Sequence, residues 1–252
     1  MEANMGLFLT LAYLFFIGSV LGWILELLYR NLTQSHKKVV NPGFCIGPYL
    51  PIYGCGLCAL YLLAALAATP FVSSPFWSKT ILFTGMALCM TLIEYAAGVF
   101  CLKYLKVRLW DYSDEWGNIN GIICPKFSAA WALLSAVYYF LIHPRILSAL
   151  NWLSNNLGFS FVIGMFFGVF IIDAAHSANF VVKLKTYAEE NKIIVKYEEL
   201  KMHIRKVQLK STGKYYFFRP FHSERPIHVS LRELHETVET HIKTLRETHK
   251  KG

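Results

Sequence analysis

The stretch GLFLTLAYLFFIGSVLGWILELLY (residues 6–29) decides the fold of this chain, because it is almost entirely apolar and holds one charged residue, Glu26. The hydrocarbon core of a bilayer is about 30 Å thick, and a helix needs roughly 20 apolar residues to cross it. We therefore predict a transmembrane helix here. The stretch is too long for a signal peptide and has neither a basic leader nor a small-residue cleavage site, so we expect it to remain in the mature protein.

Four further stretches have the same character, and the composition agrees with them. The chain of 252 residues is 55% hydrophobic and 16% charged, whereas soluble domains average about 25% charged residues. The sequence predicts an all-α, polytopic transmembrane helix bundle with five spans, at residues 6–29, 48–69, 80–102, 127–150 and 159–182. The fourth is short up to residue 142, and we expect it to continue to residue 150 with a kink at Pro144.

The distribution of Lys and Arg between the connections predicts the orientation, because basic residues collect in loops on the cytoplasmic side. The first and third connections hold most of them, and the second and fourth hold one each: Arg30, Lys37, Lys38, Lys103, Lys106, Arg108 and Lys126 against Lys79 and Arg145. We therefore expect the N-terminus outside and residues 183–252 in the cytoplasm.

Residues 183–252 form a basic tail that holds 16 of the 25 Lys and Arg residues and 9 of the 16 Asp and Glu residues, so that it carries +7 of the net charge of +9. Apolar residues at three- and four-residue steps predict an amphipathic helix over 193–207 and another over 230–245, with a connection at 211–228. Ser230 and Glu233 make a capping box for the last helix. We expect the tail to lie against anionic lipid headgroups, and favour these over nucleic acid.

Cysteine and histidine patterns predict no metal or redox site. The six cysteines fall mostly in spans or on the inward side, where thiols stay reduced. The sequence CGLC at 55–58 has redox spacing, but it lies in an apolar helix and is interpreted as structural. The five histidines between 222 and 249 are not at paired ligand spacing.

Three carboxylates lie within the predicted spans: Glu26, Glu94 and Asp173. Each one costs about 2.5–3.5 kcal/mol in lipid, so we expect all three to face the inside of the bundle, close to one another and in its cytoplasmic half. Small residues on the same helix faces allow close helix approach, and Arg30 can pair with Glu26 at i,i+4 near the membrane boundary. Two interpretations stay open: a shared site for protons, cations or a polar headgroup, or carboxylates that only hold the helices together.

Two inward connections have the composition of a binding site. The sequence NPGFCIGPYLPIYGCG (41–56) is dense in Gly and Pro, and predicts either an interfacial turn or a pocket floor whose amides hold an anion. The sequence RLWDYSDEWGNINGIICPK (108–126) contains an Asn-Gly turn signal and polar residues that either cap turns or line the same site. The candidate substrate- or ion-binding residues are Glu26, Arg30, Asn41, Gly43, Gly47, Tyr53, Glu94, Trp110, Asp111, Tyr112, Asn118, Asn120, Asp173 and His176.

These stretches also carry a resemblance to a known family. GWILELLYR, NPGFCIGPYLPIYGCG, LIEYAAG, WDYS and NINGIIC resemble, in order, the signature of a bacterial integral membrane family, the ABC transporter type IV permeases. The resemblance covers about residues 10–145 and reaches neither the fifth span nor the tail. Arginines common in the family's two inward loops are replaced here by Pro42 and Ile122, so any anionic ligand, or the charge that holds it, differs in this chain. The resemblance implies a permease of the bacterial cytoplasmic membrane.

Three functions remain open on the sequence alone. The first is a permease or transport protein that uses the inward carboxylates and the broken loop. The second is a membrane-embedded enzyme that acts on a lipid-linked or amphipathic substrate through Glu26, Glu94 and Asp111 as acids and bases. The third is a scaffold that recruits a partner through its tail. The chain has no phosphate-binding G-x-x-x-x-G-K-[ST] motif, so an ATPase would be a separate subunit, a symmetric path would need a homo-oligomer, and no cofactor is assigned.

Overall fold

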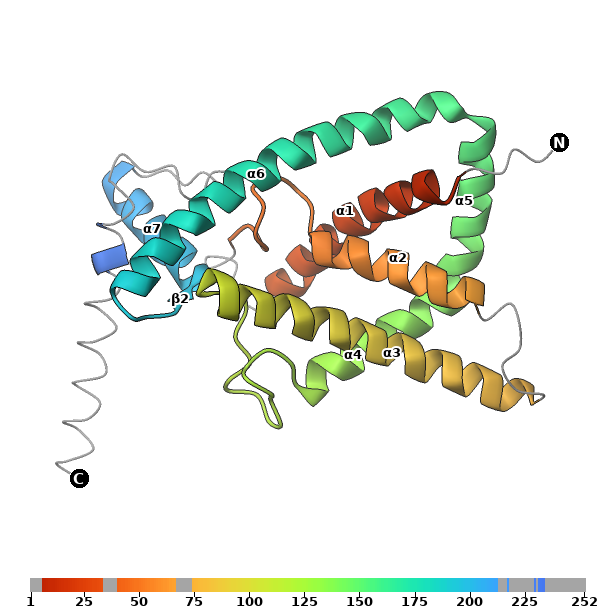
Figure 1. The fold of residues 1–252 in the computed structure, drawn as a ribbon, viewed down its shortest axis with the longest axis horizontal. Coiled ribbons are helices and arrows are strands. Elements are labelled where there is room, and N and C mark those ends of the chain that lie inside the picture. The colour runs from red at the N-terminus through yellow and green to blue at the C-terminus, as the bar shows by residue number, and fades with distance from the viewer. Residues whose placement is uncertain are drawn as a thin grey trace.

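A computed structural model describes residues 6–33, 40–66 and 74–212, together with Phe217, Val229 and residues 231–233. Five helices run side by side along the long axis of the molecule (Figure 1). They are α1 (Leu7–Thr33), α2 (Pro51–Leu66), α3 (Pro75–Phe100), α4 (Pro125–Val137) and α6 (Ser160–Glu190). The all-α bundle expected from the sequence is therefore present.

Four helical segments are long and apolar enough to cross a membrane: Leu7–Thr33, Phe76–Leu105, Pro125–Asn155 and Ser160–Glu190. The second expected span, 48–69, corresponds to α2, which is a shorter apolar helix. Residues 67–73 lie outside the described residues, so the count of five spans stays a prediction. Phe8, Leu32 and Ile172 are among many apolar side chains exposed on the outside of the helices. Such a surface is typical of a protein that is surrounded by lipid.

The fourth segment changes direction, as the sequence predicts. A π-helical turn, η3 (Tyr138–Ile142), follows α4 and leads into α5 (His143–Asn155). Figure 1 shows that α5 runs steeply across the end of the bundle to the start of α6. Tyr138 Oη lies 2.8 Å from His143 Nδ1 at this bend. The bend places residues 143–155 across the end of the bundle rather than along it.

Helices α1 and α2 pack closely because each presents glycines to side chains of the other. A Cβ on Gly22 would lie 2.2 Å from Tyr53 Cβ, and one on Gly54 would lie 2.3 Å from Ser19 Oγ. Real Cβ atoms do not approach so closely, so only glycine allows this spacing. The main core continues from this contact through Leu14, Met86 and Trp131 to Leu150.

A second core lies at the other end of the bundle from α5. Strands β1 (Val107–Arg108) and β2 (Val195–Lys196) form a short parallel pair in which Val107 is opposite Val195. Helix α6 continues past the expected boundary at residue 182 to Glu190, and α7 (Tyr197–Thr212) packs on its last turns. The second core contains Val107, Leu184, Val195, Leu200 and Ile204. The division of the chain at residue 182 stays a prediction.

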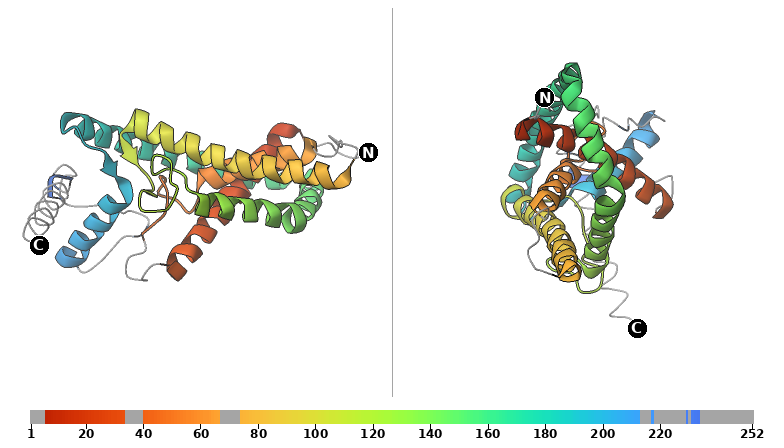
Figure 2. Two further views of the ribbon diagram at one scale, coloured as in Figure 1. Left: turned by 90° about the horizontal axis from the view of Figure 1, so that it is seen from below. Right: turned by 90° about the vertical axis from the view of Figure 1, so that its right-hand side faces the viewer.

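The two polar loops and the described part of the tail meet at this end of the molecule (Figure 2). They are the 40–50 loop, between α1 and α2, and the 106–124 loop, which follows the π-helical end of α3, η2 (Cys101–Leu105). Helix α7 overlaps the expected first tail helix, 193–207, but begins only at Tyr197, because Val195 and Lys196 form β2. Most of the expected second helix, 230–245, lies outside the described residues, although Leu231 is buried in the second core.

Candidate functional site

Glu26 is neutralised by a neighbour on its own helix. Arg30 Nε lies 2.7 Å from Glu26 Oε1, four residues away, and Arg30 Nη2 lies 2.5 Å from Glu198 Oε1 on α7. The expected pairing of Glu26 with Arg30 is confirmed. The contact with Glu198 was not expected from the sequence. Through it, the tail supplies a second carboxylate to the same guanidinium group. The cytoplasmic end expected for α1 is thereby joined to α7.

Tyr53 connects Glu26 to the middle of the bundle. Its hydroxyl group donates a hydrogen bond of 3.2 Å to Glu26 Oε2, and its ring lies against Trp131, with 5.2 Å between the centroids. The indole Nε1 of Trp131 in turn donates to Glu94 Oε2 over 3.0 Å. Helices α1, α2, α3 and α4 each contribute one member to this series.

Glu94 has a different environment from Glu26. Only 4% of its surface is exposed, and its other oxygen, Oε1, accepts a hydrogen bond of 3.1 Å from the Tyr112 hydroxyl group. Tyr112 is held by a stacked contact with Phe127, whose centroid is 4.3 Å away. Both donors to Glu94 are neutral, and no ion pair reaches it among the described residues. Glu94 is therefore a buried carboxylate without a counter-cation.

Asp173 organises the 40–50 loop. Its carboxylate accepts hydrogen bonds from the backbone amides of Ile46 (3.1 Å) and Gly47 (2.7 Å), from the Tyr49 hydroxyl group, and from Ser177 Oγ (3.1 Å). One of the two interpretations of this loop was that its amides hold an anion; in the structure the amides of Ile46 and Gly47 bind a carboxylate of the chain itself. These hydrogen bonds stabilise the negative charge of Asp173 without any ligand.

Asn41 is the second organiser of this loop and is fully buried. Its side chain accepts from Trp23 Nε1 (2.8 Å) and donates to the carbonyl oxygen of Ile46 (2.7 Å). The Lys201 amine from α7 donates to the carbonyl oxygens of Asn41 (2.9 Å) and Gly43 (2.6 Å). Gly43 has a φ of +77°, where a side chain is strained. The loop is thus fixed on one side by α6 and on the other by α7.

The 106–124 loop folds back on itself through the expected Asn-Gly turn. Asn120 (φ 55°) and Gly121 (φ 65°) are both left-handed, and Ile122 N donates to the carbonyl oxygen of Ile119. This geometry is that of a type I′ turn, which favours Asn-Gly. Asn118 caps the loop by accepting from Gly121 N over 3.0 Å, and Trp110 Nε1 donates to the Ile122 carbonyl oxygen over 2.9 Å.

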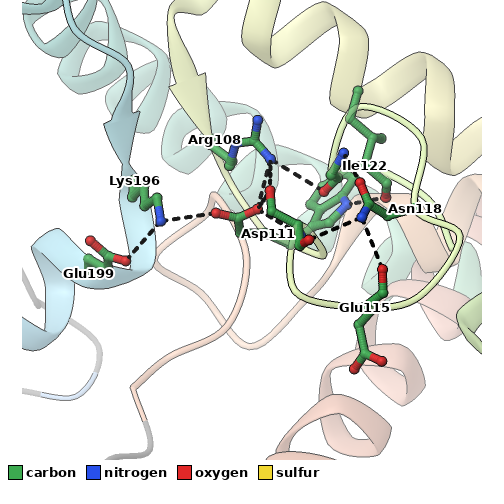
Figure 3. Close-up of polar contacts among 10 residues, drawn as sticks. Arg108, Asp111, Glu115, Asn118, Ile122, Lys196 and Glu199 are labelled. Carbon is green, nitrogen blue, oxygen red and sulfur yellow. Dashed lines mark hydrogen bonds and ion pairs between the residues drawn. The ribbon is translucent and has the colours of Figure 1, made fainter. Parts of the chain in front are cut away.

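Asp111 lies in a network of charges at the surface of this loop (Figure 3). Its oxygens lie 2.8 Å from Arg108 Nη1 and 3.1 Å from Lys196 Nζ, and Lys196 also pairs with Glu199. Burial alone would raise the pKa of Asp111. Hydrogen bonds from Ser113 and Lys196, together with the charge of Arg108, outweigh burial and lower the pKa to about 2. Asp111 is therefore ionised at neutral pH and joins the loop to the tail.

The structure divides the predicted site residues into three groups. Glu26, Arg30, Tyr53, Glu94 and Tyr112 form one polar series within the bundle. Asn41, Gly43, Gly47 and Asp173 form the 40–50 loop and its anchor, while Trp110, Asp111, Asn118 and Asn120 shape the 106–124 loop. His176 is exposed on α6 and takes no part in the Asp173 contacts.

Some functional contacts were missed at the level of sequence. Trp131, Glu198 and Lys201 were not singled out, although each contacts a predicted site residue. For Lys201 a signal existed, since this basic residue follows Leu200 on the apolar stripe of the predicted helix. The indole group of Trp131 carried no comparable signal, because an isolated Trp in a span packs against lipid or core equally well.

These features define an integral membrane protein whose polar residues collect at one end of a helical bundle. Over residues 13–178 the sequence matches the family model described as "Putative ABC-transporter type IV". The chain therefore belongs to this family. The match extends beyond the motifs that reveal it, through most of α6, and so includes Asp173. In the comparisons with curated proteins and solved structures, nothing matches the chain.

Proposed function

We propose that this chain is the membrane-spanning component of a transport system, and that Glu94 is its proton-accepting group. One observation carries the proposal: of the two carboxylates in the polar series, Glu26 is paired with Arg30, whereas Glu94 is buried with neutral donors alone. Membership of a transporter family supports the transport class.

An isolated negative charge within the bundle is costly. A carboxylate that is removed from water costs several kcal/mol unless a cation or several donors compensate for it. Tyr112 and Trp131 each donate one hydrogen bond to Glu94, but neither brings a positive charge, so together they compensate for only part of this cost. A bound proton removes the remaining cost. Glu94 thus favours the protonated state until the surroundings change and a cation or water reaches it.

A proton is the ligand that this environment admits most easily. Both Glu94 oxygens contact aromatic side chains, and the residue is 4% exposed. A larger cation requires α3 or α4 to move, whereas a proton requires only a path along hydroxyl groups. Tyr112, from the 106–124 loop, is the donor to Glu94 that comes from outside the bundle helices. It lies on the side that the Lys and Arg distribution assigns to the cytoplasm.

The family and the charge distribution indicate the surroundings of this component. We place it in the bacterial cytoplasmic membrane with the tail in the cytoplasm, because the basic connections lie at the same end as α7. A separate ATPase subunit is the expected partner, since the family is one of ABC transporters. That subunit would approach the end formed by α7 and the two polar loops.

Native mass spectrometry of the gently extracted protein tests the transport assignment. Wild type is compared with Glu94→Gln and with the matched Glu26→Gln, and any co-purifying ligand is identified before and after incubation. Transport coupled to Glu94 predicts a ligand that stays chemically intact and whose retention depends on pH in wild type but not in Glu94→Gln. A converted ligand would favour the enzymatic alternative, and retention that is the same in all three proteins at every pH would contradict the role of Glu94.

A further inference from the structure

The 106–124 loop and the end of α3 line an open pocket of about 570 Å³. Lys103, Arg108 and Asn120 provide polar groups on its lining, and Val99, Leu102 and Ile122 provide apolar ones. The lining of the pocket contains none of the residues of the polar series around Glu94. The 106–124 loop and the end of α3, which line it, lie at the end of the bundle where the polar loops meet (Figure 1).

The polar side of the pocket is positively charged and has free donors. Lys103 forms no ion pair or hydrogen bond within the described part of the chain, and its amine lies 5.7 Å from the Tyr104 ring centroid. The contacts of Arg108 to Asp111, Ser113 and Gly121 all use Nη1, so Nε and Nη2 have no partner among the described residues and remain for a ligand. Figure 3 shows Arg108 close to Ile122 on the loop. Asp111 is shared between Arg108 and Lys196, so it does not cancel both cations.

The apolar side of the pocket continues along the surface of α3. Val99 and Leu102 are three residues apart and share a face of the helix. Leu88, Leu92 and Tyr95 precede them on the same face, at steps of three or four residues. Leu88 is 59% exposed and Leu92 is 64% exposed. This strip leads from the pocket toward the middle of the membrane. A ligand with a charged end and an apolar chain fits both parts.

We propose that this pocket binds the phosphate group of an anionic phospholipid, with one acyl chain along the exposed strip of α3. Lys103 and the free nitrogens of Arg108 contact the phosphate oxygens, since Arg and Lys are the usual partners of phosphate. Asn120 contributes polar contact at the rim. Basic side chains between transmembrane helices on the cytoplasmic side form lipid headgroup sites in this way.

The test uses the full-length protein in nanodiscs of phosphatidylcholine that contain a small fraction of phosphatidylglycerol. Native mass spectrometry counts the phosphatidylglycerol molecules that remain bound. Lys103→Gln removes a charge from the pocket, and Asn120→Asp adds a repelling charge while it keeps a residue type that tolerates the left-handed backbone. Lys106→Asn is the matched control, because it removes the same charge three residues away from Lys103 and outside the pocket lining.

The proposal predicts that Lys103→Gln lowers phosphatidylglycerol retention about fivefold, which corresponds to about 1 kcal/mol for one basic side chain. Asn120→Asp has at least as large an effect, and Lys106→Asn retains the lipid within about twofold of wild type. An equal loss of phosphatidylglycerol in all three variants shows nonspecific electrostatic attraction between the protein and the lipid, and overturns the proposal. Excess inorganic phosphate distinguishes a site for a lipid headgroup from a site for free phosphate. Lipid that stays bound supports the proposal, whereas displacement of the lipid by phosphate overturns the assignment of an acyl-chain ligand.

Discussion

The Lys201 amine on α7 lies 2.9 Å from the Asn41 carbonyl oxygen in the loop between α1 and α2. Lys201 is 1% exposed and Asn41 is equally buried, so the tail inserts a hydrogen-bond-donating amine beneath this loop. The carboxylate of Asp173 holds the amides of the same loop from α6. The 40–50 loop therefore connects the tail to the bundle, so a shift of α7 would also change the position of this loop.

Replacing Lys201 with Met removes the donor and keeps an unbranched side chain. We expect Lys201→Met to leave the carbonyl oxygens of Asn41 and Gly43 unsatisfied, at a cost of about 1–3 kcal/mol. The thermal midpoint in detergent should fall by several degrees. Lys206→Met on the exposed side of the same helix is the control and should leave the midpoint unchanged. Equal midpoints for Lys201→Met and wild type would show that this contact is unimportant for stability.

The pH dependence of stability should also report on Lys201. Burial is the largest cause that lowers the pKa of Lys201, Arg30 also lowers it, and Glu198 and Cys45 act in the opposite direction. The result is a pKa of about 7 instead of the ordinary 10.5. The unfolded chain binds this proton more tightly than the folded chain, so stability rises with pH between about 7 and 10.5. We expect the thermal midpoint of wild type to gain more than that of Lys201→Met between about pH 7 and about pH 9. An identical gain in both proteins would assign the pH dependence to other groups.

Loss of the Asp173 charge should open the 40–50 loop. Cys45 in this loop is 3% exposed, and burial, together with the charge of Asp173, raises the pKa of its thiol to about 12. We expect Asp173→Asn to speed maleimide labelling of Cys45 about tenfold, which is equivalent to about 1.4 kcal/mol of loop stability. Peptide mass spectrometry separates Cys45 from the other cysteines. Ser177→Ala removes one hydrogen bond from the same carboxylate and should have a smaller effect, so the reverse order of the two variants would count against the anchor.

The close contact of α1 and α2 predicts opposite outcomes for two glycines. Gly22→Ala places a methyl group 2.2 Å from Tyr53 Cβ, whereas Gly85→Ala places one in open space on α3. Overpacking costs about 1–3 kcal/mol, while alanine in an open helical position gains up to about 1 kcal/mol. The thermal midpoint should therefore fall for Gly22→Ala and stay equal or rise for Gly85→Ala. A Gly22→Ala protein as stable as wild type would mean that the two helices are farther apart than described.

The bundle and several of its local contacts were predictable from residues near one another in sequence. Apolar length predicted the helices, the spacing of Glu26 and Arg30 predicted their ion pair, and Asn120 with Gly121 predicted the type I′ turn. Each of these features depends on a few consecutive residues. The resemblance over about residues 10–145 likewise indicated the family that the match to residues 13–178 shows.

The long-range partners were not predictable in the same way. The sequence grouped Asp173 with the other two carboxylates, but its partners come from residues 46–49, more than 120 positions away, and from Ser177. The pairing of Val107 with Val195 joins the tail to a loop through the backbone, which leaves no mark on side-chain pattern. A carboxylate in a span looks the same in sequence whether amides, an arginine or neutral hydroxyl groups surround it. Only the fold separates these three cases.

Infrared difference spectroscopy of the protein in membranes tests the role of Glu94 most directly, because a protonated carboxyl group has a C=O stretching band that a carboxylate lacks. A titration through neutral pH is recorded for wild type, Glu94→Gln and Glu26→Gln. The account predicts a carboxylic acid band in wild type that persists in Glu26→Gln and is absent from Glu94→Gln. A wild-type spectrum without that band, or a band that survives in Glu94→Gln, would show that Glu94 does not hold the proton.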